Sequence, residues 1–248
     1  MRVISRLDIK NNYLIKGLAL EGLRKLGPAA DFSKKYYKDG ADEIIYIDTV
    51  ASLYSRDGIF DLLKDTVKEV FIPISVGGGI RTVEDAYNYF LNGADKIFIN
   101  TAAVNNPGLI NKLVTDFGSA NVSLSIEAKK NHNKQDWSVY TSSGRDDSKK
   151  NVVEWVKEAV GRGIGEVLLT SIDNDGFQKG FDLDLITKIS EDIEVPLVIS
   201  GGFGEVTHLA PLTNNISGIA IGSALHYEKI TVNQIKTQLE KLGYETRK

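Results

Sequence analysis

The chain has 248 residues, of which 42% are hydrophobic, 8% aromatic and 25% charged. This composition excludes a disordered chain and supplies enough apolar side chains for a sizeable core. Lys and Arg total 30 against 33 Asp and Glu, so the net charge of −3 leaves no basic excess with which to bind nucleic acid. No apolar stretch reaches signal-peptide or transmembrane length, so we expect a cytoplasmic protein that does not enter a membrane.

Cysteine is absent, which excludes disulfides, thiolate metal sites and a thiol nucleophile. The three histidines are too scattered along the chain to suggest a metal cluster. We therefore expect no metal and no cofactor.

Short β-branched apolar runs alternate along the chain with amphipathic segments. Strands are predicted at 3–8, 43–48, 73–77, 96–100, 122–128, 166–170, 196–200 and 218–222. Helices are predicted at 29–39, 57–69, 82–92, 106–117, 149–162, 181–191, 205–214 and 229–242. Eight strand–helix pairs predict a parallel sheet that closes into a TIM (β/α)8 barrel. No linker or charge block interrupts this pattern, so we expect residues 1–248 to form one domain.

The two halves of the chain resemble each other. The run Pro73-Ile-Ser-Val-Gly-Gly-Gly79 corresponds to Pro196-Leu-Val-Ile-Ser-Gly-Gly202 at an offset of 123 residues, and Glu43 corresponds to Glu166 at the same offset. This repetition predicts two similar (β/α)4 halves, and therefore two similar ligand-holding ends. Long connections at 9–28 and 129–148 follow the first and fifth strands, where we expect lids or binding loops.

Glycine pairs follow the third and seventh strands, each ahead of a predicted helix. Their backbone N–H groups could approach an anion, with the helix adding its positive end, although tight turns alone would also require glycine. Asn100-Thr101 and Gly222-Ser223 end the neighbouring strands. Because loops after the last two strands of such barrels are a frequent phosphate site, the doubled pattern favours two phosphate-binding ends.

Acidic side chains end three strands at Asp8, Asp48 and Glu127. Asp8 and Glu127 occupy equivalent places in the two halves, so they should face each other across the mouth and could act as a general acid–base pair. A lone carboxylate in such a place is often only a cap. Lys16, in the first long connection, could close over an anionic ligand or simply remain solvated.

Charged residues also stand where strands begin, at the opposite end of the barrel. From the residues alone, Arg2, Glu43, Lys96 and Glu166 are best explained as a stabilising salt-bridge cluster.

Taken together, these motifs resemble the HisF family, the cyclase subunits of imidazole glycerol phosphate synthase. The matching stretches are Arg6-Leu-Asp-Ile-Lys10, Leu14-Ile-Lys-Gly17, Ile47-Asp-Thr-Val-Ala-Ser52, Val76-Gly-Gly-Gly-Ile80, Ile99-Asn-Thr-Ala-Ala-Val104, Leu169-Thr-Ser-Ile-Asp-Asn-Asp-Gly176, Ser200-Gly-Gly202 and Gly222-Ser-Ala224. The run from Ser171 to Gly176 favours the cyclase over its sister isomerase.

The resemblance implies a reaction and a partner. A HisH-like glutaminase forms a heterodimer with the barrel and releases ammonia, which crosses the barrel to the bisphosphorylated substrate PRFAR. The products are imidazole glycerol phosphate and AICAR. The absence of cysteine fits this division of labour, because the family's glutaminase uses a thiol.

The resemblance also assigns roles to residues. Asp8 is implied as a catalytic acid–base, opposite Glu127, and Lys16 as a loop residue that holds the closed complex. One phosphate is implied at Gly79, Asn100 and Thr101, and the other at Gly176, Gly202, Gly222 and Ser223, with Asp48, Thr170 and Asp175 nearby. The resemblance implies that the charged residues at the starts of the strands, Arg2, Glu43, Lys96 and Glu166, form the ammonia gate. It places Asp95 at the partner surface.

Two positions depart from the family. The second catalytic carboxylate of the family is an aspartate, which is Glu127 here, and a cysteine commonly stands where this chain has Arg6. Strand alternation points Arg6 and Asp8 the same way, and a buried arginine needs an acidic partner, for which Glu127 is a candidate. HisF-like paralogues that amidinate surface-polysaccharide sugars show such departures. Three alternatives to the cyclase therefore stand: such a paralogue, an aldose–ketose isomerase of the sister family, and a glutaminase-activating scaffold.

Overall fold

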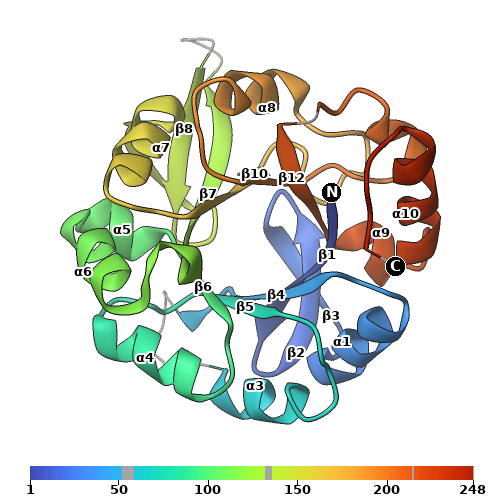
Figure 1. The fold of residues 1–248 in the computed structure, drawn as a ribbon, viewed down its shortest axis with the longest axis horizontal. Coiled ribbons are helices and arrows are strands. Elements are labelled where there is room, and N and C mark those ends of the chain that lie inside the picture. The colour runs from blue at the N-terminus through green and yellow to red at the C-terminus, as the bar shows by residue number, and fades with distance from the viewer. Residues whose placement is uncertain (52–58, 132–135, 214, 248) are drawn as a thin grey trace.

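Eight parallel strands form a closed barrel in the computed structural model, which describes residues 1–51, 59–131, 136–213 and 215–247 (Figure 1). In order around the barrel they are β1 (Arg2–Lys10), β4 (Glu43–Asp48), β5 (Ile74–Gly77), β6 (Lys96–Ile99), β7 (Val122–Asn131), β10 (Glu166–Ser171), β11 (Leu197–Ser200) and β12 (Ile216–Ile221). The strand β12 pairs in parallel with β1, which closes the sheet. The predicted TIM-barrel fold is confirmed, and all eight predicted strands are present.

Helices surround the strands (Figure 1). They are α1 (Ala29–Lys38), α3 (Phe60–Thr66), α4 (Val83–Leu91), α6 (Gly108–Phe117), α7 (Val152–Gly161), α8 (Leu183–Ser190) and α10 (Val232–Lys241). Each buries an apolar face, as α10 does with Val232, Ile235 and Leu239, because side chains three and four residues apart share one side of a helix.

One predicted helix, at 205–214, is wrong. The structure has only the short 3-10 helix η2 (Val206–Leu209) there. Pro211 follows closely and has no N–H group to donate to the preceding turn, which disfavours a longer helix. Residue 214 of this prediction, and 57 and 58 of the predicted helix 57–69, lie outside the described residues.

The two long connections are mainly antiparallel extensions of the barrel strands. After β1 come β2 (Tyr13–Leu18) and β3 (Glu21–Pro28), and after β7 come β8 (Asp136–Thr141) and β9 (Asp146–Asn151). The expectation of loops is therefore corrected to two hairpins, and the first three residues of the predicted helix 149–162 belong to β9. Residues 132–135 of the second connection lie outside the described part of the chain.

The two hairpins have left-handed backbone at equivalent positions of their tips. Ala19 and Leu20 have φ values of 48° and 63°, and Ser142 and Ser143 have 53° and 59°. Ala19 and Leu20 form a two-residue tight turn, because Leu18 pairs with Glu21. The second loop is longer, since Thr141 pairs with Asp146, and Gly144 also has a positive φ, of 79°. The two turns are offset by the 123 residues that separate the sequence repeats, so the half-barrel repetition extends to the hairpins.

Short helices repeat in the same way at the ends of β6 and β12. The helix α5 (Thr101–Asn105) follows Asn100, which has φ −137° and ψ −88°. The helix α9 (Ser223–His226) follows Gly222, which has φ −112° and ψ −89°. A further 3-10 turn, η1 (Ser119–Asn121), precedes β7.

The barrel interior is filled by one apolar layer. Its members, at most 1% exposed, come from six strands: Ile4, Ile45, Phe98, Leu168, Val198 and Ala220. A larger apolar cluster lies between the sheet and the helices. The interior layer divides a charged end, where the strands begin, from the mouth, where they finish.

Candidate active site

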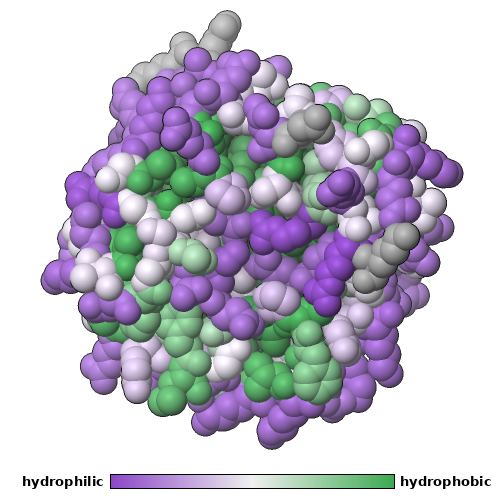
Figure 2. Space-filling model, viewed as in Figure 1, coloured by the Kyte–Doolittle hydropathy of each residue, from purple (hydrophilic) through white to green (hydrophobic). Residues whose placement is uncertain are grey.

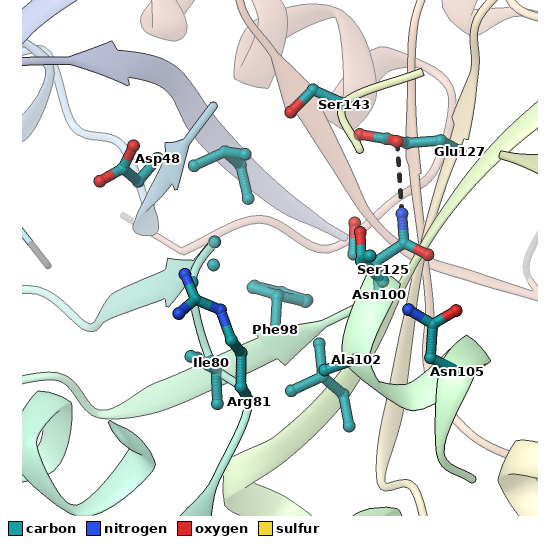
Figure 3. A pocket seen from close by; sticks show the side chains of 16 residues that line it. Asp48, Ile80, Arg81, Phe98, Asn100, Ala102, Asn105, Ser125, Glu127 and Ser143 are labelled. Atoms are coloured by element: carbon teal, nitrogen blue, oxygen red, sulfur yellow. Dashed lines mark hydrogen bonds between the residues drawn. The ribbon is translucent and has the colours of Figure 1, made fainter. Parts of the chain in front are cut away.

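A cavity of about 230 Å³ opens at the mouth beside β5 and β6 (Figure 3). Its lining includes five residues predicted for the site: Asp48, Gly79, Asn100, Thr101 and Glu127. The structure therefore brings together the residues predicted for the first phosphate-binding end and one of the two predicted catalytic carboxylates.

Asp48 lies at this first end. The family resemblance had placed it near the second end. Its Oδ1 accepts hydrogen bonds from the backbone N–H groups of Val50 and Ala51, both at 3.0 Å. The reason is the barrel order, because β4 lies next to β5 and far from β11.

The second predicted end lies across the mouth, at β10, β11 and β12. A pocket there is lined by Asp175, Gly176, Gly202, Gly222 and Ser223, as predicted, and its free space is only about 10 Å³. The side chains of Arg6 and Lys16 line the same pocket and occupy much of it. Thr170 lies beneath, fully buried.

Two glycines of this end are required by close backbone contacts. A Cβ atom on Gly202, whose φ is 100°, would lie 1.9 Å from the carbonyl oxygen of Gly180. A Cβ atom on Gly176 would lie 2.4 Å from the carbonyl oxygen of Gly17. The second contact joins the loop after β10 to the β2–β3 hairpin, and the N–H of Ala19 adds a hydrogen bond of 2.9 Å to the carbonyl of Asp175. The hairpin is thereby held against the mouth.

Asp8 is held between two cations. Its Oδ1 accepts a hydrogen bond of 3.2 Å from Nε of Arg6, and its Oδ2 one of 3.0 Å from Nζ of Lys16. Lys16 also donates to Asp175 at 2.8 Å. All four side chains are buried, so these ion pairs are poorly screened by solvent.

The cations decide the protonation of Asp8. Burial by itself would raise the pKa of this carboxyl, but the charges of Lys16 and Arg6 outweigh burial and hold the pKa well below its usual range. Asp8 and Asp175 in turn raise the pKa of Lys16, although burial opposes this. Lys16 is therefore neither solvated nor free.

Glu127 has a different environment. Its Oε2 accepts hydrogen bonds from the N–H of Gly144 at 2.8 Å and from Nδ2 of Asn100 at 3.3 Å (Figure 3). Burial raises the pKa of Glu127 to about 7, and Arg6 and the Gly144 amide only partly oppose this. A carboxyl with a pKa near neutrality can both give and take a proton at physiological pH.

The pairing of Arg6 suggested from the sequence is wrong. Among the described residues Arg6 forms its ion pair with Asp8 and none with Glu127. Its Nη1 donates instead to Thr170 at 2.7 Å and to Ser200 at 3.3 Å. These two hydroxyls, on β10 and β11, hold the guanidinium in place.

Sequence reasoning missed several residues that line the mouth: Arg81, Asn105, Ser125, Ser143 and Ser200. Ser125 precedes Glu127 by two residues on β7, so strand alternation could have identified it. Ser143 reaches the cavity only because the β8–β9 hairpin folds back, which the sequence did not reveal. His226 bonds Tyr36 through Nδ1 at 2.7 Å and lies behind Gly222.

A charged ring closes the opposite end of the barrel. Arg2 bonds Glu43 at 2.8 Å and also bonds Glu166, and Lys96 bonds Glu166 at 2.5 Å. Figure 2 shows hydrophilic residues at the centre of this amino-terminal face, with hydrophobic patches around them. The structure thus brings together the four predicted ring residues.

Asp95 lies outside this ring. Its Oδ2 accepts a hydrogen bond of 2.8 Å from the N–H of Ile74, so it anchors the start of β5. Over the described ranges, no group of three or more His, Cys, Asp or Glu side chains is placed to hold a metal ion. Nor does any described helix have the length and apolar character needed to span a membrane.

Comparison with known proteins identifies relatives over nearly the whole chain. Residues 2–231 match the model of the family described as histidine biosynthesis protein. A Legionella pneumophila protein named imidazole glycerol phosphate synthase subunit HisF is 50% identical over 206 residues, which cover 83% of this chain and 97% of that protein. Proteins of the same name from Thermococcus onnurineus and Pyrococcus furiosus are each 40% identical over 247 residues, covering 99% of this chain and 97% and 98% of theirs.

The fold and the site define a (β/α)8-barrel enzyme whose polar groups converge at the carboxyl ends of the strands. The sequence relationships are more specific than the architecture. The chain belongs to the histidine biosynthesis protein family and, within it, to the HisF subunits of imidazole glycerol phosphate synthase. The family predicted from the sequence motifs is confirmed.

Proposed function

We propose that this chain, acting as a single domain, converts PRFAR and ammonia to imidazole glycerol phosphate and AICAR in histidine biosynthesis. The observation that carries the proposal is the arrangement of the mouth. Two glycine-lined ends lie on opposite sides, and a carboxylate lies beside each one, Glu127 at the first and Asp8 at the second. A substrate with a phosphate at each end would reach from one glycine-lined end to the other. Its reacting centre would then lie between the two carboxylates.

The two carboxylates are suited to different work. Asp8, ionised and paired with two cations, would stabilise positive charge on the substrate or accept a proton once its partners move. Glu127, with its pKa at about 7, would exchange protons with the substrate at neutral pH.

The proposal is tested with the purified protein, PRFAR and ammonium chloride at alkaline pH, where free ammonia is abundant. Formation of imidazole glycerol phosphate and AICAR in equal amounts supports the reaction. Asp8→Asn should abolish product formation. Failure of the unsubstituted protein to form product, while it still binds inorganic phosphate by calorimetry, would refute the proposed reaction.

A second subunit would supply the ammonia. The relatives are named as subunits of a synthase, and we propose a HisH-like glutaminase that docks on the amino-terminal face as a heterodimer. Phe71 and Leu91, which are 71% and 69% exposed, precede β5 and end α4 on this side of the barrel and would contribute apolar contacts. Asp95 would lie at this surface, and the charged ring would control entry of ammonia. The complex would be cytoplasmic.

One observation favours a second candidate function. Arg6 occupies the mouth and neutralises one oxygen of Asp8, so the site differs electrostatically from one with a small neutral residue there. This favours an ammonia-using synthase with another substrate, such as the precursor of an amidinated surface sugar. Assaying the same protein with PRFAR and with nucleotide-linked keto sugars, each with ammonium chloride, distinguishes the two.

A further inference from the structure

Arg6 is a buried cation with unused hydrogen-bonding capacity. It is 4% exposed, and its Nε and Nη1 bond Asp8, Thr170 and Ser200. Its second terminal nitrogen, Nη2, has no hydrogen-bond partner in the part of the chain that the structure describes. A guanidinium has five N–H donors, so Nη2 remains available to an acceptor on a ligand.

Arg6 belongs to the second glycine-lined end. It lines the same pocket as Gly176, Gly202, Gly222 and Ser223. A guanidinium beside several backbone donors is an arrangement that binds phosphate oxygens. Arg6 was not among the residues that the family resemblance assigned to phosphate.

This end has little room for a ligand as it stands. Its free space is about 10 Å³, and Cε of Lys16 lies 3.7 Å from the position that a Cβ atom on Gly222 would occupy. A phosphate group can therefore enter only if the Lys16 side chain, and the ion pairs that hold it, rearrange.

The charges make such a rearrangement possible. Arg6 and Lys16 carry two positive charges that Asp8 and Asp175 balance. Asp8, Asp175 and Glu127 are the acidic groups that face Arg6, and His226 lies behind Gly222. A phosphate dianion competes for the same cations with a higher charge and more acceptor oxygens than one carboxylate.

We propose that Arg6 is a further phosphate-binding residue of the second end, and that a phosphorylated ligand takes Arg6 and Lys16 over from Asp8. Phosphate binding would then free both oxygens of Asp8, so its pKa would rise towards the ordinary range. The carboxylate would become able to exchange protons only when substrate is present. This inference deepens the proposed function, since it concerns the same substrate site.

Calorimetry with inorganic phosphate tests the binding role. The protein should show two phosphate sites, and Arg6→Met should weaken one of them about tenfold, the typical effect of removing a charge-assisted hydrogen bond. Arg6→Lys, which keeps the charge, should restore part of the loss. Arg81→Met is the matched control, because Arg81 lines the first end and should affect only the other site. Unchanged affinity at both sites in Arg6→Met would overturn the proposal, as would the absence of phosphate binding.

Nuclear magnetic resonance of the unsubstituted protein tests whether phosphate replaces Asp8 as the partner of Arg6. This experiment does not depend on the folding of a variant. In arginine-labelled protein, the Nε–H signal of Arg6 should shift on saturation with inorganic phosphate, because it loses Asp8 as its acceptor. A signal that does not move at saturation would overturn the proposal that Arg6 leaves Asp8 for phosphate.

The phosphate-binding role of Arg6 and the proposed reaction can fail independently of each other. Arg6-dependent phosphate binding without PRFAR turnover would refute the reaction and leave this role intact. Turnover with phosphate binding that does not depend on Arg6 would refute this role alone.

Discussion

Glu127→Gln should stabilise the protein by an amount that grows with pH. The folded structure holds the pKa of Glu127 at about 7, against 4.5 for an ordinary glutamate. Between these values the folded chain binds a proton that the unfolded chain releases, so the free energy of unfolding falls as pH rises. At about 1.4 kcal/mol for each pKa unit, this linkage removes about 2 to 3 kcal/mol of stability between pH 5 and pH 8.

Glutamine carries no titrating proton, and its carbonyl oxygen can still accept the hydrogen bond from Gly144. Urea unfolding at pH 5 and pH 8 should therefore show the variant gaining about 2 to 3 kcal/mol over the unsubstituted protein across this range. Glu194→Gln, at an exposed glutamate before β11, is the control and should show a difference that does not change with pH. A stability difference for Glu127→Gln that is the same at both pH values would show that folding does not raise the pKa of Glu127.

Three further predictions follow from other contacts. Lys16→Met leaves two buried carboxylates without their shared cation, and should cost about 3 to 5 kcal/mol of unfolding free energy in urea at pH 8, whereas a cost below about 1 kcal/mol would contradict this. Gly202→Ala should destabilise the fold by more than Gly40→Ala in thermal unfolding, because both have positive φ but only a Cβ on Gly202 meets backbone atoms; equal costs would contradict this. Glu166→Gln removes the negative charge shared by two ring cations, and should lower glutamine-driven turnover of the glutaminase complex about tenfold or more while leaving ammonium-driven turnover within about twofold.

The strands were predictable because their burial is simple. A strand buried on both sides reads as a continuous apolar run, as in Glu43–Asp48, and eight such runs at regular spacing define the barrel. The hairpins were not predictable in this way. Strand β3 is largely exposed along its length, so no apolar alternation marks it, and its pairing depends on the extension of β1 beyond the barrel.

The sequence predicted which residues lie in the site better than it predicted their hydrogen-bond and ion-pair partners. Strand ends and glycine turns placed Asp8, Glu127 and the two phosphate-binding ends at the mouth. Alternation showed that Arg6 points inward but could not choose its partner, because that choice depends on the hydroxyls of Thr170 and Ser200. These lie on strands far away in sequence, and only the closed barrel brings them to Arg6.

We propose that the two carboxylates of the mouth act together on a bisphosphorylated substrate with ammonia. The most direct measurement is turnover of PRFAR with ammonium chloride by the unsubstituted protein and by Asp8→Asn and Glu127→Gln. We predict formation of imidazole glycerol phosphate by the unsubstituted protein and its loss in both variants. Turnover that survives in either folded variant would contradict the paired-carboxylate mechanism, and its absence from the unsubstituted protein would contradict the proposed reaction.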